Sequence, residues 1–531
     1  MELAPLIPPL LCCGALYSFV LVIYRLFAHP LARFPGPKLA AATKWYEFYF
    51  DICKGHGGQF AWEIDRMHDI YGPIVRVNPD ELHVKDPEFY KVLYAGNPTQ
   101  RDKWPPAASM AGTGQGTFGT VDHNVHRKRR AANSYFFSQK SIAGAEPLLR
   151  ERVQELCEIF HDGFLHEKVI ELKLTFLAFS TDTVCQYVFA EPPSLQKNAE
   201  DAKRWHETIE AVGKITPLIK QFPWLIPVAK KVPSAIVDFF LPTLGRLLSY
   251  HLHVHRQAHS HVQKTSSSSE KGDVPQSKKS SYTLFHAIQD SSLPPHEKSI
   301  SRLANEAFVV IAAGGETTAR TLAFAVYHIH ANPQVLTRLL EELTVAMPKI
   351  TDLPSIKTLQ QLPYLVGQAK LTFINAALIL PKSAVIKETL RISAMVTSRL
   401  PLVSPEELKY KEWTIPRKTP VGMTINSVLR DPTVFPSPVD FLPERWIGNA
   451  GTSTAGDEYF VAFGKGTRMC QGMNFAYAEL YLVVALLVRR FEFQLYETSR
   501  DRDIEIVRDY FLGEADPQSL GVRVKIVRER E

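Results

Sequence analysis

Apolar residues recur along most of this chain at the spacing of an α-helix, and alternating runs are short. Residues 301–331 form one long periodic stretch that stops before Pro333, and residues 472–491 form another that contains two arginines near its end. A proline beyond the last periodic residue and basic residues in the last turn both indicate the end of a helix. Strand-like segments are confined to short pieces such as 74–86 and 413–425. The pattern predicts a mainly α-helical fold with small β-sheets.

The N-terminal segment is apolar enough to be a membrane anchor. Residues 3–24 contain no charged side chain, and at about 1.5 Å per residue they form a helix of roughly 33 Å, enough to cross a bilayer core. Basic residues follow this run and none precedes it, so the positive-inside tendency places the rest of the chain in the cytosol. A cleaved signal peptide is the alternative, against which the missing basic n-region argues. We predict a single-pass anchor over residues 1–27 and a stiff, proline-rich hinge over 28–38.

Composition and charge are consistent with one globular domain after the hinge. Of the 531 residues, 45% are hydrophobic, which allows a large core, and the net charge of +6 gives no reason to expect a nucleic-acid partner. The six cysteines contain no CxxC pair, which argues against zinc sites and a disulfide framework. The serine-rich, charged residues 264–281 predict a disordered surface loop. We therefore expect a single domain over residues 39–531.

The segment FGKGTRMCQG, which ends at Gly472, combines features that few chemistries need. Cys470 lies where a long helix should begin, and helix N-termini stabilise thiolates. Gly464 and Gly466 permit a tight turn before it, and Gly472 allows a flat ligand to approach because it has no side chain. Arg468 can pair with a carboxylate of that ligand. A large planar acid that takes one soft axial ligand is heme, and thiolate ligation prepares its iron for O₂ activation.

These ten residues resemble the heme-binding signature FxxGxRxCxG of the cytochrome P-450 monooxygenases at every fixed position: Phe463, Gly466, Arg468, Cys470 and Gly472. The resemblance covers nearly the whole chain after the hinge. It implies the fold of that family in a single catalytic domain, heme b as the cofactor, Cys470 as the axial iron ligand and the other four residues as heme contacts. Residues 472–503 look closest to the fungal, microsomal, trichodiene-oxygenase-like branch, whose members often act on terpenoid or polyketide intermediates.

The segment AGGETT, residues 313–318, places two glycines inside the first long helix. Each glycine costs about 1 kcal/mol relative to alanine, so another role must offset it. The segment is similar to the family motif AGx[DE]T[TS], which implies that the helix opens above the heme to admit O₂. Thr317 would then hydrogen-bond the reacting oxygen and Glu316 would help to relay protons, because proton delivery needs a hydroxyl and an acid close together. The alternative is a loosely packed helix with a surface glutamate.

Two weaker patterns become informative once the heme-binding signature is present. Glu388 and Arg391 have the i, i+3 spacing of one helix face, which alone indicates an ordinary surface pair. The later segment FLPERW, residues 441–446, adds Arg445. In the family, these motifs form a buried charge triad that holds the core beside the heme. The resemblance therefore implies a structural role for the three residues.

Other basic residues match positions that bind heme propionates in the family. The run HRKRR, residues 126–130, would alone indicate a solvated helix face or a basic targeting patch. The family usually has WxxxR here, and this chain has His126 in place of the tryptophan and retains Arg130. Imidazole can also donate to a carboxylate. Arg399 lies eight residues after Arg391, where the family often has another propionate-binding arginine.

Two segments depart from simple readings. Residues 114–119 spell GxGxxG, but a dinucleotide fold needs a preceding apolar strand, and RDKWPPAASM is none. The resemblance places this segment in the loop above the heme, lining the substrate cavity. Residues 366–382 are not expected by the family pattern, and removing them restores a normal entry to the helix of Glu388. Valine codons begin with GT and one lysine codon ends in AG, so we interpret the insertion as a retained intron, which transcript sequencing would test.

We thus predict a heme-dependent monooxygenase that inserts one O₂-derived oxygen into a lipophilic small molecule. No flavin- or nicotinamide-binding segment is recognisable, so electrons would come from a separate NADPH-cytochrome P-450 reductase. As a microsomal enzyme it would lie on the endoplasmic reticulum membrane with its catalytic domain in the cytosol. One alternative is a heme-thiolate isomerase or dehydratase, against which the pair Glu316–Thr317 argues. The other is an inactive heme protein, made so by the insertion.

Overall fold

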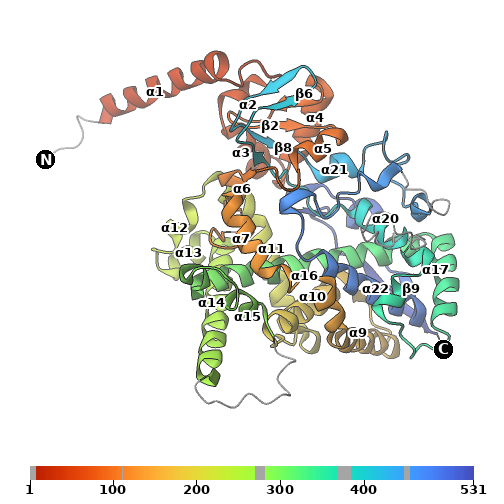
Figure 1. Ribbon diagram of the computed structural model, residues 1–531. Helices are drawn as coiled ribbons and strands as arrows, with labels where there is room; N and C mark the ends of the chain where they lie inside the picture. The colour runs from red at the N-terminus through yellow and green to blue at the C-terminus, as the bar shows by residue number, and fades with distance from the viewer. Residues whose placement is uncertain (1–6, 111, 270–281, 367–383, 448–454, 531) are drawn as a thin grey trace.

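The computed structural model describes residues 7–530 apart from 111, 270–281, 367–383 and 448–454. Long helices fill most of the body (Figure 1). Strands from both halves of the chain gather at one edge with several short helices. Helix α1 (Ile7–Ile23) projects away from the body. The predicted class, mainly helical with small sheets, is confirmed.

The helices follow the predicted distribution. The longer ones after α1 are α4 (Phe60–Tyr71), α7 (His123–Ser134), α9 (Glu146–Leu165), α10 (Leu172–Phe189), α11 (Ala199–Gln221), α14 (Pro242–Ser269), α16 (Ile300–Ala331), α17 (Pro333–Ala346), α20 (Ala384–Ser393) and α22 (Met473–Arg490). The shorter ones are α2 (Lys38–Ala42), α3 (Trp45–Phe48), α5 (Pro87–Leu93), α6 (Pro105–Ser109), α8 (Gln139–Gly144), α12 (Leu225–Ala229), α13 (Ser234–Phe240), α15 (Leu284–Gln289), α18 (Ile356–Leu359), α19 (Pro363–Val366), α21 (Ile425–Leu429) and α23 (Arg500–Asp503).

The described strands are short. The largest sheet has the order β1 (Ile74–Arg76), β2 (Leu82–Val84), β8 (Pro420–Gly422), β5 (Leu402–Val403) and β3 (Asp102–Lys103), and only the β2–β8 pair is parallel. A second, antiparallel sheet has the order β4 (Ile170–Glu171), β12 (Arg523–Glu529) and β9 (Phe491–Leu495). Two antiparallel pairs complete the set: β6 (Leu408–Tyr410) with β7 (Trp413–Ile415), and β10 (Arg508–Tyr510) with β11 (Leu512–Glu514).

Two buried apolar clusters make up most of the core. One joins the long helices around α16, and the other lies around the largest sheet with α5 and α21. Ile447, Phe460 and Ala462 pack against both clusters. Because Ala462 directly precedes Phe463, the cysteine segment begins where the two clusters meet.

The two long periodic stretches form α16 and α22 as predicted. Helix α16 starts after Ser299, whose side chain accepts the backbone N–H of Arg302, and it ends before Pro333, which opens α17. Helix α22 starts immediately after Gly472 and ends with two arginines before β9. The sequence signals located both helices because they are local.

The segment expected to be a stiff hinge is docked on the body. Leu31 and Phe34 are buried, the Phe34 ring stacks on Trp413, and the carbonyl of Pro35 accepts the Arg76 N–H at 2.7 Å. Residues 28–38 therefore pack against the body of the protein, because apolar side chains between the prolines contact neighbouring strands.

Two other expectations concern the loops. Helix α14 extends to Ser269, so the chain remains helical six residues into the segment 264–281 that we expected to be a loop. The remainder of that segment lies outside the described residues. The insertion 366–382 also lies outside them except for Val366, the last residue of α19. The hypothesis of a retained intron therefore stays a prediction.

Candidate functional site

The cysteine segment is held in a turn that only glycine permits at one position. Gly464 and Gly466 have φ angles of +71° and +72°. A Cβ on Gly466 would lie 2.4 Å from the carbonyl oxygen of Ala95, so no side chain fits there. The backbone N–H of Cys470 donates to the carbonyl of Phe463 at 2.8 Å, which closes the turn. The Phe463 ring lies 5.2 Å from the Tyr477 ring of α22.

The Cys470 side chain is accessible to solvent, although it lies among many protein atoms. Burial raises the pKa of its thiol, whereas the N–H of Gly472 and the charge of Arg130 lower it. Gly472 caps the N-terminus of α22, and a Cβ on it would meet nothing within 4 Å. A soft donor thus sits at a helix N-terminus with open space beside it, as a flat ligand requires.

Three of the predicted basic residues gather around this segment. Arg130 of α7 donates to the carbonyl of Met469 at 2.6 Å, and Arg468 donates to the carbonyls of Thr120 and Val121, both at 2.7 Å. His126 is buried, and its Nδ1 has no hydrogen-bond partner. Burial and the neighbouring cations lower the pKa of His126 to about 3, and burial lowers that of Arg468 to about 10. The imidazole is therefore neutral and can donate one proton to an acceptor.

A fourth basic side chain, Lys103 of β3, was missed by the sequence analysis. Its Nζ donates to the carbonyl of Phe118 at 2.6 Å and lies 3.5 Å from the centre of that ring. Burial and the charge of Arg468 lower the Lys103 pKa well below its usual value. The sequence RDKWPP alone does not indicate a binding role for its lysine. That role depends on Arg468, which is more than 300 positions away in the sequence.

The four basic groups fit an anionic ligand beside the cysteine. In the part of the chain that the structure describes, none of them forms an ion pair with a carboxylate (Lys103, His126, Arg130, Arg468). Burial lowers the pKa of all four groups, and an anion bound among them would favour their charged forms. Two carboxylates on a planar ring, as heme carries, match this donor set together with the thiol of Cys470 and the open side of Gly472.

Arg399, predicted to bind a propionate, has carboxylate partners inside the protein. Its guanidinium donates to Glu81 at 2.7 and 3.0 Å and to Glu47 at 2.8 Å, and the side chain is buried. Lys220 of α11 pairs with the same Glu47. Two buried glutamates distant in sequence therefore bind Nε and one terminal nitrogen of Arg399. A heme contact through Arg399 stays a prediction.

The charge triad is present as the resemblance implied. The carboxylate of Glu388 accepts both Nε and a terminal nitrogen of Arg391, at 2.9 and 2.8 Å, and Nε of Arg445 at 3.0 Å. It also accepts the indole N–H of Trp446 and the backbone N–H of Leu442. Arg391 further donates to three carbonyls between residues 429 and 440. The triad thus ties α20 to the segment that precedes the cysteine turn.

The glycines of the AGGETT segment have a packing role. Helix α16 is continuous through residues 313–318, which differs from the opening that the family motif implied. A Cβ on Gly315 would lie 2.7 Å from Thr181 Oγ1, and one on Gly314 would lie 3.0 Å from Val184. The hydroxyl of Ser180 donates to the Gly315 carbonyl at 2.7 Å. The glycines therefore let α10 and α16 approach closely.

Glu316 and Thr317 point to different faces of α16. Glu316 is buried, accepts Nε of Arg320 at 2.5 Å and lies 3.5 Å from Lys173. Burial raises its pKa, but the charges of Arg320 and Lys173 outweigh burial and lower the pKa to about 2. Thr317 faces the more open side and donates to its own helix at the carbonyl of Ala313, at 2.7 Å. No hydrogen bond between these two side chains is found in the described structure.

Comparison with known proteins gives a consistent result. The family profile described as Cytochrome P450 matches residues 43–517. A tryptophan 6-hydroxylase of Fusarium equiseti is 39% identical over 97% of this chain and 96% of its own length. An N-acetyltryptophan 6-hydroxylase of Emericella nidulans is 38% identical over 94% and 93%, and a conidiogenone synthase of Penicillium rubens is 36% identical over 97% and 98%.

Proposed function

The chain belongs to the cytochrome P-450 family, and from this premise we propose that Cys470 binds heme b as axial ligand while Lys103, His126, Arg130 and Arg468 hold its propionates. The chain is an oxidoreductase, a heme-dependent monooxygenase of the type found in secondary metabolism. The proposed heme contacts rest on one observation: the basic side chains around Cys470 are largely buried and, among the described residues, form no ion pair with a carboxylate.

The proposed chemistry divides the work between cofactor and protein. A heme bound through a cysteine thiolate supplies electron density that favours cleavage of the O–O bond. The hydroxyl of Thr317 lies on the open side of α16 and can exchange its hydrogen bond to the Ala313 carbonyl for one to the reacting oxygen. Glu316 is an anion held by Arg320, so it can take up a proton only when that contact opens.

The proton role of Thr317 predicts uncoupling in Thr317→Ala. The variant should bind heme normally, but product per NADPH consumed should fall about tenfold or more, with hydrogen peroxide formed instead, since positioned proton donors contribute this much or more. Product, NADPH and peroxide are measured in one reaction. Thr344→Ala is the matched control, because exposed Thr344 makes the same bond to the carbonyl four residues earlier. Unchanged coupling in Thr317→Ala would exclude the proposed role.

The Lys103 contact predicts a change in heme retention. Lys103→Met keeps the apolar stem but removes a charge-assisted hydrogen bond, so heme should dissociate about tenfold faster to an apomyoglobin acceptor. Lys103→Arg should retain most of the wild-type rate. Lys168→Met, at an exposed position, serves as the control. Equal dissociation rates in Lys103→Met and the wild type would remove Lys103 from the heme site.

We further propose that the substrate is a lipophilic small molecule such as a terpenoid or polyketide, and that an NADPH-cytochrome P-450 reductase supplies the electrons. The relatives support a secondary metabolite but are named for different reactions, two of which are hydroxylations of tryptophan or N-acetyltryptophan. Tryptophan and N-acetyltryptophan therefore belong in the first panel of substrates beside terpenoid and polyketide extracts.

The proposed function is tested with the chain and a reductase produced together in a host. Oxygenated metabolites that require both proteins, and that are absent from a source strain lacking the gene, support it. Turnover of a hydroperoxide without NADPH would instead favour the isomerase or dehydratase. A protein with full heme content but no NADPH-dependent product from any extract would favour the inactive heme protein.

The N-terminal helix supports attachment to the endoplasmic reticulum membrane. The apolar stretch Leu11–Ala28 has no residue buried against the body. Removal of residues 1–27 should therefore release a heme-competent protein, measured by sedimentation and by the CO difference spectrum. A truncated chain that still sediments with membranes would point to other membrane-binding surfaces, such as the exposed aromatics in or next to α12 and α13: Trp224, Phe239 and Phe240.

A further inference from the structure

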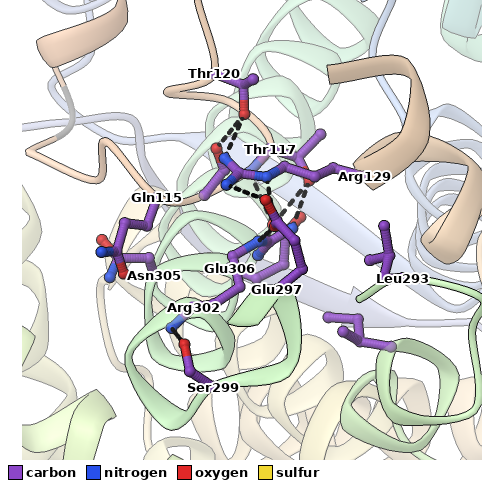
Figure 2. A network of polar contacts seen from close by, with 12 residues as sticks. Gln115, Thr117, Thr120, Arg129, Leu293, Glu297, Ser299, Arg302, Asn305 and Glu306 are labelled. Atoms are coloured by element: carbon purple, nitrogen blue, oxygen red, sulfur yellow. Dashed lines mark hydrogen bonds and ion pairs between the residues drawn. The ribbon is translucent and has the colours of Figure 1, made fainter. Parts of the chain in front are cut away.

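A buried polar network fastens one loop to α16 (Figure 2). The loop comprises residues 113–121, between α6 and α7, and we call it the 113–121 loop. Glu306 of α16 accepts the backbone N–H and the hydroxyl of Thr117, both at 2.8 Å. The same carboxylate accepts Arg302 at 2.6 Å and the amide of Asn133 at 3.0 Å. One carboxylate thus joins the loop to α16 and α7.

A second ion pair extends this network to the end of the loop. Arg129 of α7 makes two hydrogen bonds of 2.7 Å to Glu297, and it also donates to the Thr120 hydroxyl at 2.9 Å (Figure 2). Glu297 accepts Arg302 as well, at 3.3 Å, and Arg302 reaches the Thr117 hydroxyl at 3.2 Å. The two carboxylates and two guanidiniums balance in charge, so the loop is held by a closed set of paired, largely buried groups.

The loop lies beside the proposed reaction site at its C-terminal end. The carbonyls of Thr120 and Val121 accept Arg468, two positions before Cys470. Between Thr117 and Thr120, the Phe118 ring lies against Lys103. It is also 5.7 Å from the ring of Phe511, the residue between β10 and β11. The loop therefore brings an aromatic side chain next to the basic cluster.

Glu306 shares a face of α16 with the proposed catalytic threonine. Glu306, Ala313 and Thr317 are separated by seven and four residues, which places them on one stripe of a helix. The loop covers this stripe at Glu306, which is buried, whereas Ala313 and Thr317 are more open. The eleven residues from Glu306 to Thr317 span roughly 16 Å at about 1.5 Å each. The loop therefore covers one end of the stripe, about the length of a small-molecule substrate away from Thr317.

We propose that Glu306 is a positioning residue that fixes the 113–121 loop against the substrate-facing stripe of α16 and thereby sets which bulky ligands reach the heme. This rests on the proposed function, because the stripe is a substrate surface only if heme binds at Cys470. Replacing Glu306 by glutamine removes the closest negative charge from Arg302. It also leaves one acceptor oxygen for the donors of Thr117, Arg302 and Asn133. The loop then moves away from α16, and the space beside Phe118 changes in size.

The test uses the full-length protein in nanodiscs and two variants. Glu306→Gln keeps the shape of the side chain, and Thr117→Val removes only the hydroxyl, which provides a milder change should the first variant fold poorly. Glu146→Gln is the matched control, since Glu146 also pairs with an arginine four residues later and accepts a backbone N–H, but at Ile356, away from the loop. Imidazole and a bulky phenyl-substituted imidazole serve as heme-ligating probes, read by difference spectroscopy.

The expected result is a change in size selectivity without loss of the heme site. Glu306→Gln should retain the thiolate-type CO spectrum and bind imidazole within twofold of wild type, whereas its affinity for the bulky probe should change about tenfold. Hydrogen exchange of residues 113–121 should quicken about tenfold, and in Glu146→Gln it should not. Wild-type exchange together with wild-type selectivity in both loop variants would overturn the proposal. A wild-type protein without a thiolate spectrum would refute the proposed function instead, and the exchange data would still decide whether Glu306 holds the loop.

Discussion

Cys470→Ala is expected to abolish the thiolate-type CO spectrum and to reduce monooxygenase activity below detection. The substitution removes the soft donor at the start of α22, while Gly464, Gly466 and the turn they form remain. The basic side chains around the site stay in place, so some heme should still associate through its propionates. We therefore expect bound heme with a spectrum typical of a nitrogen or water ligand.

This prediction has a clear control among the other cysteines. Cys53 is also exposed and free, and Cys53→Ala should keep both the spectrum and the activity. A thiolate spectrum that persists in Cys470→Ala would show that another residue binds the iron. The proposed active site would then have to be abandoned, including the roles given to Lys103 and Thr317.

The second large effect is expected from Glu388→Ala, which should destabilise the protein by about 3–5 kcal/mol. The carboxylate accepts five hydrogen bonds, and its removal leaves the Arg391 guanidinium, which has no exposed side-chain surface, without its only anionic partner in the described structure. The midpoint of urea unfolding should fall accordingly, and the heme content of the purified protein should fall with it. Heme is lost because the triad holds the segment that leads to the cysteine turn.

The matched control is an exposed pair with similar chemistry. Glu200 pairs with Arg204 at 3.5 Å on the surface of α11, where both side chains are more than half exposed. Glu200→Ala should change the unfolding free energy by less than about 1 kcal/mol, because solvent screens such pairs. Equal unfolding midpoints for Glu388→Ala and Glu200→Ala would mean that the triad contributes little to stability.

Several features could be predicted from the sequence because their causes are local. The turn before Cys470 requires glycine at positive φ, and Gly466 has no space for a side chain. The ends of α16 and α22 follow from a capping serine, a proline and two terminal arginines. These signals predicted the helical class and the central helices, and the heme-binding signature predicts Cys470 as the iron ligand.

Other features depend on which distant residues meet when the chain folds. Arg399 lies at a promising position in the sequence, yet Glu47 and Glu81, more than 300 residues earlier, bind it in the interior. Glu316 and Thr317 are adjacent in sequence, but helical geometry and the partner Arg320 turn the acid away from the hydroxyl.

The same reason explains the residues that no motif indicated. Lys103 is a candidate heme contact because folding places it beside Arg468. Glu306 is a candidate positioning residue because it accepts a hydrogen bond from Thr117, 189 positions earlier in the sequence. The chain thus encodes turns, helix ends and the candidate ligand Cys470 in short local patterns. The pairing of buried charges arises from long-range packing, because the free energy of a buried charge depends on the neighbours that the fold brings to it.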